Sequence, residues 1–188
     1  MNYICSNTFA LKPLNRSEKE KITKNEPFPS TPLSMEIDET DKKILHLLQR
    51  DAHLTLKDIA NEINLSLTPV HDRVKRLERE GYIEHYVALL NKKKVGNHLT
   101  VYCQVTLLKQ TIDLSEAFNA AILLLPEVVE CSFISGNFDY LLKVVLPDME
   151  SYHDFNQKKL SIMPQVALIN SFFVIREVKN TTVIPIYQ

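Results

Sequence analysis

Apolar side chains recur at helical spacing soon after residue 37. Ile44, Leu45 and Leu48 fall on one face of a helix, and three acidic residues stand ahead of them, where the positive end of a helix dipole favours negative charge. A second helix begins after Thr55, a residue suited to the N-cap. Its inward residues are Leu56, Ile59, Ala60 and Ile63. Asn64 follows and tolerates the left-handed turn that often ends a helix.

A third helix is predicted within LSLTPVHDRVKRLEREG, residues 65–81. Ser66 or Thr68 caps it, Pro69 sits in its first turn and Gly81 closes it. Its predicted inward residues are Leu67, Val70, Val74 and Leu77. The next stretch, GYIEHYVALLN, is rich in β-forming residues and predicts a short hairpin. Three helices followed by such a wing indicate a winged helix-turn-helix, whose helix-turn-helix covers about residues 56–75.

Beyond Gly96 strands and helices alternate. LTVYCQVTLL, VVECSFIS, YLLKVVL and VALINSFFVI read as strands. One predicted helix runs from Asp113 through Leu125, and another starts at Asp148 or Ser151 and runs through Ile162. Two consecutive βαβ units predict a ferredoxin-like βαββαβ sandwich, with both helices on one face of the sheet. The fold class is therefore α+β.

These patterns divide the chain into three parts. Residues 1–35 lack a helical period and predict a disordered tail, and translation starting at Met35 is a hypothesis. Residues 36–96 form the winged helix-turn-helix, and residues 97–188 form the sheet domain. Because the strands are apolar on both faces, the uncovered face is expected to pack on a partner, so oligomers are expected. TTVIPI near the C-terminus is a candidate edge strand.

Composition narrows the function. The 188 residues include only three glycines, too few and too dispersed for a phosphate-binding loop, and the net charge of −1 requires any DNA contact to come from a local patch. Six histidines are scattered, and three cysteines lie far apart, so no metal or cofactor is expected. Cys103 and Cys131 are predicted to be buried. With neither a membrane span nor a secretory signal, we expect a cytoplasmic protein.

The third helix carries the residues expected to contact DNA. Recognition helices point their N-terminal half at base edges, and Arg73 can pair with guanine while Thr68 or Pro69 can touch a thymine methyl group. Lys75 and Arg76 are suited to phosphates. The alternative for Arg79 is an ion pair with one of its glutamate neighbours. The predicted DNA-contacting residues are Ser66, Thr68, Pro69, His71, Asp72, Arg73, Lys75 and Arg76.

Three long motifs in fixed order carry a family resemblance. ETDKKILHLLQRDAHLTLKDIA, LSLTPVHDRVKRLEREGYIEHYVALLN and SGNFDYLLKVVLPDMESY resemble the leucine-responsive regulatory protein/AsnC (feast/famine) transcription regulators, and the leucine-responsive branch most. The resemblance covers about residues 36–185. Leu67, Asn137 and Gln165 depart from the commonest family pattern, which has a proline, a second acid and a glycine there. The departure at Asn137 bears on effector preference.

The resemblance implies a sequence-specific regulator associated with the nucleoid. It implies dimers that bind roughly palindromic double-stranded DNA, dimers that assemble into octamers, and a small effector between dimers near the turn GNFDY. Taken alone, that turn predicts a hairpin with a positive φ at Gly136. Its amides can hold a carboxylate and Asp139 an ammonium, which suits an amino acid such as leucine. The implied effector-binding residues are Ser135, Gly136, Asn137, Phe138, Asp139 and Tyr140.

Two alternatives remain beside the regulator. Some sirohaem decarboxylases share this two-domain layout, but such an enzyme needs His or Arg groups around a tetrapyrrole. The sheet domain has one arginine and two histidines, and the third helix keeps its polar face. We therefore expect no enzyme. A nucleoid-organising protein with little sequence preference differs from a specific regulator only in degree, and the sequence does not separate them.

Overall fold

The computed structural model describes residues 37–187, so the predicted tail and the proposed start at Met35 lie outside the described residues. Three helices come first: α2 (Glu39–Arg50), α3 (Leu56–Glu62) and α4 (Leu67–Arg79). Asp38 and Thr55 cap α2 and α3 through capping boxes, which satisfy backbone N–H groups that have no partner inside the helix. Asn64 (φ 57°) and Gly81 (φ 78°) adopt the left-handed conformation predicted beside the helix ends.

The three helices, here called the helical domain, share one small core. Ile44, Ile59 and Val70 are fully buried and come from α2, α3 and α4 respectively. Ser66 is the N-cap of α4. The prediction that Leu67 faces inward is wrong, because its side chain is 52% exposed. Leu67 is the first residue of the helix, where the chain has only just turned away from α3.

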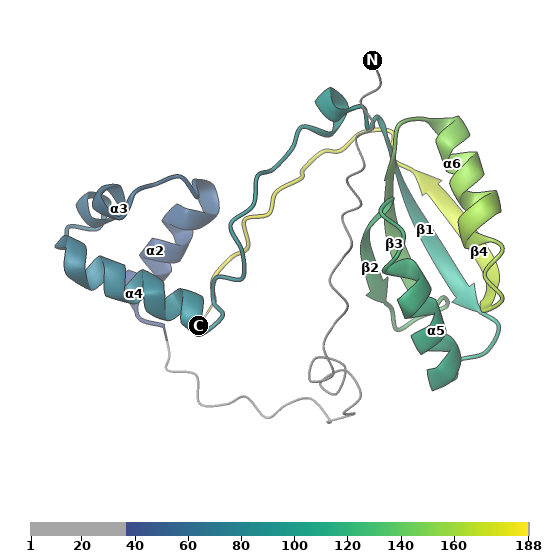
Figure 1. Ribbon diagram of the computed structural model, residues 1–188, viewed down its shortest axis with the longest axis horizontal. Helices are drawn as coiled ribbons and strands as arrows, with labels where there is room; N and C mark the ends of the chain where they lie inside the picture. The colour runs from purple at the N-terminus through teal and green to yellow at the C-terminus, as the bar shows by residue number, and fades with distance from the viewer. Residues whose placement is uncertain (1–36, 188) are drawn as a thin grey trace, which may run out of the picture.

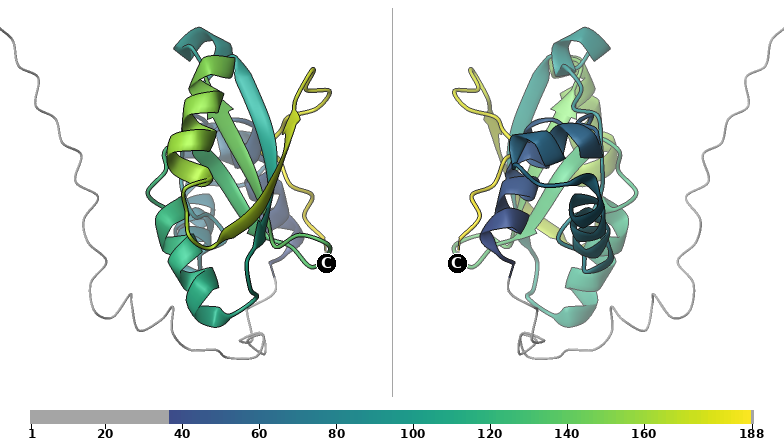
Figure 2. Two further views of the ribbon diagram at one scale, coloured as in Figure 1. Left: turned by 90° about the vertical axis from the view of Figure 1, so that its right-hand side faces the viewer. Right: turned by 90° about the vertical axis from the view of Figure 1, so that its left-hand side faces the viewer.

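Four strands and two helices form the second unit, here called the sheet domain. The strands are β1 (Leu99–Leu107), β2 (Val128–Phe133), β3 (Tyr140–Leu146) and β4 (Val166–Phe173). They are antiparallel, in the order β2-β3-β1-β4, as the ferredoxin-like topology requires. Helix α5 (Ile112–Ile122) and helix α6 (Met149–Phe155), which continues as a π-helix (Asn156–Leu160), lie on one face of the sheet (Figures 1 and 2).

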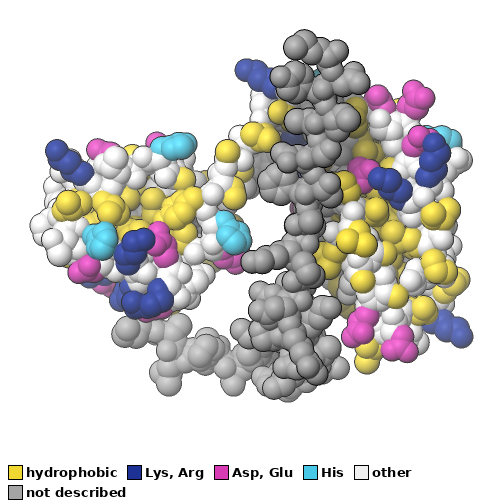
Figure 3. All heavy atoms as spheres, viewed as in Figure 1, with side chains coloured by type: hydrophobic (Ala, Val, Ile, Leu, Met, Phe, Trp, Pro, Cys, Tyr) yellow, Lys and Arg dark blue, Asp and Glu magenta, His cyan; other side chains and the backbone are white. Residues whose placement is uncertain are grey.

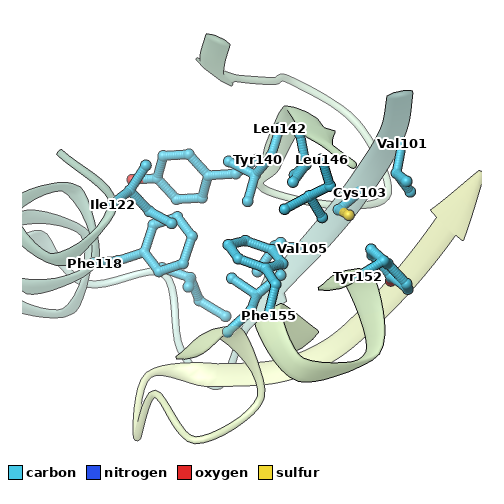
Figure 4. Packing of buried hydrophobic residues seen from close by; sticks show 13 residues of the cluster. Val101, Cys103, Val105, Phe118, Ile122, Tyr140, Leu142, Leu146, Tyr152 and Phe155 are labelled. Atoms are coloured by element: carbon cyan, nitrogen blue, oxygen red, sulfur yellow. The ribbon is translucent and has the colours of Figure 1, made fainter. Parts of the chain in front are cut away.

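The core of the sheet domain lies between these helices and the sheet. Every second residue of β1 from Val101 and of β3 from Tyr140 is buried, the alternation expected when one sheet face is covered. Phe118 from α5 and Phe155 from α6 fill the space above the strands (Figure 4). The ring of Phe118 lies 4.6 Å from that of Tyr140, centroid to centroid. Aromatic packing thus joins α5 to the beginning of β3.

The opposite face of the sheet carries apolar and polar side chains together. Strand register places Tyr102, Leu141 and Phe172 on this face, and Phe172 is half exposed. Gln104 and Lys143 lie on the same face. The expected apolar face is therefore present, but it is interrupted by polar residues.

Two extended segments connect the domains, and the predicted hairpin at residues 81–91 is wrong. The chain leaves α4 by a turn and runs extended to a short 3₁₀-helix (Lys92–Val95), without a β-ladder. The stretch has β-forming residues but no two-residue turn that would fold it back on itself. In Figure 1 the teal segment after α4 runs beside the yellow C-terminal tail. Both segments expose apolar side chains, including Val87, Leu90 and Val178.

The C-terminal segment is not the edge strand predicted at TTVIPI. It returns to the helical domain, where the backbone N–H of Ile184 donates to Gln49 Oε1 at 2.8 Å and Gln49 Nε2 donates to the carbonyl of Ile184 at 3.3 Å. Ile186 packs against the helical core. Pro185 has no N–H to donate to a sheet, which disfavours a ladder there.

Smaller differences concern local geometry. Gly136 does not have the predicted positive φ, since within residues 37–187 only Gly81 and Gly96 do among the glycines. Cys103 is buried as predicted, but Cys131 is exposed on β2. Across the described part of the chain, no helix has both the length and the apolar character needed to cross a membrane.

Candidate DNA-binding helix and effector turn

Most side chains predicted to contact DNA lie on the surface of α4. Because Val70, Val74 and Leu77 face the core, the opposite side of the helix faces outward. Six of the predicted residues are exposed: Ser66, Thr68, Pro69, His71, Asp72 and Lys75. Exposed residues at positions i, i+4, i+7 and i+11 form a line along the helix, here called the outer row: Thr68, Asp72, Lys75 and Arg79. The outer row combines hydrogen-bonding groups with two cations, as DNA contact requires.

Arg73 and Arg76 occupy a different place from the outer row. Arg73 Nη1 donates to Asp38 Oδ2 at 2.6 Å and to Asp41 Oδ1 at 2.8 Å, and Arg76 Nη2 donates to Asp41 Oδ2. Asp41 is fully buried at the start of α2. The two arginines that sequence reasoning assigned to a base and to a phosphate are thus engaged in ion pairs with α2.

These ion pairs change how the charged groups titrate. Burial acts to raise the pKa of Asp38, but hydrogen bonds from the Asp41 N–H and from Arg73 outweigh it, so the pKa of Asp38 is lowered. Hydrogen bonds to Asp41 and then Asp38 raise the pKa of Arg73. Asp38 and Arg73 are therefore both charged at neutral pH.

The other flank of α4 is also held. Glu78 accepts a hydrogen bond from Lys75 Nζ at 2.9 Å and from Tyr86 Oη at 3.1 Å. Burial, followed by the bond to Glu78, raises the pKa of Tyr86 to about 12, so the phenol stays protonated and donates. For Arg79 the alternative of a glutamate partner is present but weak, since Arg79 Nη2 lies 3.5 Å from Glu80 Oε1 and Arg79 is largely exposed.

The predicted effector residues occupy the turn between β2 and β3. Ser135, Gly136 and Asn137 are exposed and Phe138 is half buried, whereas Asp139 and Tyr140 are buried. The turn is closed by the Ile134 N–H, which donates to the Asp139 carbonyl at 2.8 Å. Its tip thus presents backbone amides and one carboxamide to solvent.

Asp139 uses both carboxylate oxygens inside the protomer. Its Oδ2 accepts from the Leu107 N–H and its Oδ1 from Gln110 Nε2, each at 2.7 Å, and its own N–H donates to the Val105 carbonyl at 3.0 Å. Only 1% of the residue is exposed. Asp139 therefore fastens the turn to the end of β1, and this occupies the oxygens that sequence reasoning offered to an ammonium group.

Sequence reasoning did not single out Gln110 as the partner of Asp139, and it linked Asp38 and Asp41 only to the dipole of α2. Their partners lie about thirty residues away in the chain, and nothing in local spacing indicates them. The outer row did leave a signal, because Arg79 follows Thr68, Asp72 and Lys75 at helical intervals. Among residues 37–187, no group of three or more His, Cys, Asp and Glu side chains gathers as a metal site would require.

Family models match both domains. A winged helix-turn-helix DNA-binding model matches residues 37–84, and the Lrp/AsnC ligand binding domain matches residues 100–184. The leucine-responsive regulatory protein of Salmonella typhimurium is 39% identical over 146 residues, which cover 78% of this chain and 89% of that protein. The leucine-responsive regulatory protein of Escherichia coli K12 is 38% identical with the same coverage.

Solved structures give the same picture. A transcriptional regulator from Neisseria meningitidis, in complex with L-methionine, superposes with a TM-score of 0.77 at 34% identity, over 80% of this chain and 97% of that one. An AsnC family transcriptional regulator from Agrobacterium tumefaciens superposes with a TM-score of 0.76 at 35% identity, over 79% and 97% of the two chains. The similarity therefore extends over both domains.

Proposed function

This chain belongs to the Lrp/AsnC family of DNA-binding transcription regulators, and we propose that it reads DNA with the outer row of α4 and responds to an amino acid at the turn of residues 134–140. The family matches support a regulator with a winged helix-turn-helix and a ferredoxin-like ligand-binding domain, and they do not favour the decarboxylase alternative. One observation carries the proposal: the outer row is continuous and exposed along α4, the second helix of the helix-turn-helix. It consists of Thr68, Asp72, Lys75 and Arg79.

Each part of the row suits a different element of DNA. Thr68 and Asp72 lie in the N-terminal half of α4, which in helix-turn-helix proteins approaches base edges. Lys75 and Arg79 lie further along, where cations reach phosphates and add affinity with little sequence information. Ser66, Pro69 and His71 flank the row and complete the proposed contact surface.

The amino-acid effector is supported by the fold and by the relative that was solved with L-methionine. The exposed tip of the turn, from Ser135 through Phe138, is the part that can meet a ligand, and Asp139 and Tyr140 hold its shape. Leucine is one candidate and methionine another. Asn137, which stands where an acid is common in the family, is the residue we expect to set the preference.

We also propose that the chain works as an oligomer. The open face of the sheet exposes the apolar side chains of Leu168 and Phe172 to water, which is unfavourable for a monomer. Packing two such faces would form a dimer with two recognition helices, suited to roughly palindromic sites, and dimers would assemble further into octamers. The protein would act in the cytoplasm on the nucleoid, with the domain boundary near residue 96.

The test measures binding to the DNA upstream of the protein's own gene and to random DNA across salt, by fluorescence anisotropy. Lys75→Gln and Arg79→Gln should each lower the slope of log affinity against log salt by about 0.9, because each removes one phosphate contact. Lys109→Gln, an exposed lysine of the sheet domain, is the matched control and should leave the slope unchanged. Equal affinity for both DNAs at every salt would refute specific regulation.

A second measurement addresses the effector. Calorimetric titration with a panel of amino acids that includes leucine and methionine should show binding, and Asn137→Asp should change the preference among them. Asn61→Asp, at an exposed position of α3, should not. Absence of binding by every amino acid would refute this part of the proposal and leave DNA recognition standing.

A further inference from the structure

Asp38 and Asp41 together present four carboxylate oxygens at the start of α2, and each oxygen has a partner. Asp38 Oδ1 accepts from the Asp41 N–H at 2.8 Å, and Asp41 Oδ2 accepts from the Asp38 N–H at 3.0 Å. The remaining capacity goes to α4, through Arg73 to both residues and through Arg76 to Asp41. The capping box that begins α2 is therefore also the receptor for two arginines of the recognition helix. This arrangement is here called the arginine clamp.

The arginine clamp acts on two successive turns of α4. Residues advance by about 100° around a helix, so Arg73 and Arg76, three positions apart, lie on neighbouring parts of one flank. Glu78 lies on the other flank and is bonded to Tyr86. The helix is thus held from both sides, and rotation about its own axis would break contacts on at least one of them. The outer row faces away from both flanks.

If either arginine moved away to bind DNA, the buried carboxylate of Asp41 would lose a compensating positive charge. Asp41 has 1% of its side chain exposed, so its charge depends on the two guanidinium groups for compensation. The arginines themselves retain 30% and 25% exposure. Arg76 Nε is buried and has no hydrogen-bond partner among residues 37–187, which places the body of this side chain inside the domain and away from a phosphate.

We infer that Arg73 and Arg76 are positioning residues that set the angle of α4 in the groove through Asp41, and that they are not DNA ligands. The inference rests on the proposed DNA-reading role of α4 and assigns its contacts to the outer row. A small rotation of a recognition helix moves every base-contacting atom at once, so the clamp controls sequence preference more than general affinity for the backbone.

The experiment compares wild type with Asp41→Asn, Arg76→Gln and the double variant, in full-length chains. Affinity for upstream and for random DNA is measured across salt. The positioning role predicts a fall of about tenfold in the ratio of specific to random binding, with the salt slope unchanged because no phosphate contact is lost. The double variant should lose no more than the worse single variant, because all three changes break the same contact.

Other roles leave different signatures. A phosphate-contacting Arg76 would lower the salt slope by about 0.9 in Arg76→Gln and leave Asp41→Asn unaffected. A base-contacting Arg76 would make the two losses add in the double variant. A purely stabilising clamp would lower specific and random binding by the same factor, through the folded fraction. Each of these three results would overturn the inference.

Milder variants guard against loss of folding. Asp38→Asn retains a good N-cap and removes only one charge from the half-exposed end of the clamp, so it should fold and lower the binding ratio by a few fold. Arg73→Lys keeps the positive charge on a single ammonium group that can still pair with Asp41, so it should keep more of the ratio than Arg73→Gln. A ratio for Asp38→Asn that lies between those of wild type and Asp41→Asn, with circular dichroism unchanged, supports the inference. A ratio equal to that of wild type counts against it.

The same data distinguish failure of the inference from failure of the proposed reading surface. If Lys75→Gln and Arg79→Gln leave the salt slope unchanged while the clamp variants still alter the binding ratio, the outer row is wrong and the clamp stands. If the outer-row variants behave as expected and the clamp variants do not, the positioning role of the clamp is wrong and the outer row stands as the reading surface. Equal binding of both DNAs by wild type would overturn both.

Discussion

Among residues 37–187, each domain contains one fully buried carboxylate, and the two are satisfied in different ways. Asp41 in the helical domain is compensated by two arginines from another helix. Asp139 in the sheet domain is satisfied by neutral donors, a backbone N–H and a carboxamide. Charged partners give strong but adjustable contacts that tie one helix to the next, whereas the neutral donors fasten a turn within a sheet. The first arrangement orients a helix, and the second shapes a loop.

Asp139→Ala should have the largest effect on stability. It leaves the Leu107 N–H and Gln110 without their acceptor, at a cost of about 3 kcal/mol in the free energy of unfolding. Denaturant unfolding followed by circular dichroism measures it. Asp139→Asn keeps one acceptor and should lose about half as much, and Asn137→Ala, at the exposed tip, should lose little. A loss below about 0.5 kcal/mol for Asp139→Ala would show that the buried bonds contribute nothing.

Asp41→Ala should destabilise the helical domain by about 2 kcal/mol. The loss falls short of that for a fully buried ion pair because Arg73 and Arg76 are partly exposed and can be hydrated once the carboxylate is gone. The same unfolding measurement applies. Glu39→Ala removes an exposed ion pair with Lys42 in the same turn of α2 and should cost under about 0.5 kcal/mol. Equal losses for the two variants would remove the distinction between buried and exposed carboxylates.

Acid should weaken the helical domain to a smaller extent. Burial acts to raise the pKa of Asp38, but its hydrogen bonds to the Asp41 N–H and to Arg73 lower it overall. The pKa of Glu78 is lowered chiefly by its hydrogen bond to Lys75. Their contribution is complete above the ordinary values of 3.8 and 4.5 and is lost as pH falls through the lower folded values. Thermal unfolding between pH 6 and pH 3 should show the decline, and Asp38→Asn should make it shallower. A parallel decline in that variant would exclude Asp38 as a source.

Leu67→Ala should have the smallest effect, a change within about 0.5 kcal/mol, because the side chain is mostly exposed at the first turn of α4. Val70→Ala, one turn further and fully buried, should cost about 2 kcal/mol. Thermal melts of the two variants make the comparison. A large loss for Leu67→Ala would restore the inward position that the helical pattern predicted.

Much of the fold follows from local pattern. Apolar spacing and capping residues such as Thr55 act between neighbours in the chain, so they predict α2, α3 and α4 without knowledge of the tertiary structure. The four strands and the two βαβ units follow in the same way, and Asn64 and Gly81 mark turns that the structure contains. The exposed face of α4 and the position of the turn between β2 and β3 were likewise predictable from the sequence.

The predictions that were wrong depend on what a segment meets in space. The stretch after α4 favours an extended backbone, but pairing needs a partner strand, and here the neighbouring segment is the returning tail (Figure 1). Hydrophobic side chains consequently remain visible at the surface between the domains (Figure 3). The same reason applies to TTVIPI, which meets Gln49 of the helical domain and no sheet edge.

The order of elements, the two domain types and the helix proposed to read DNA all follow from the sequence, because helical period, caps and turns are properties of adjacent residues. Only the tertiary structure decided which of that helix's cations face outward. Arg73 and Arg76 are bound to acids more than thirty residues away, and Asp139 to donors almost as distant. Burial and charge pairing are set by which elements pack together, and no local pattern contains that information.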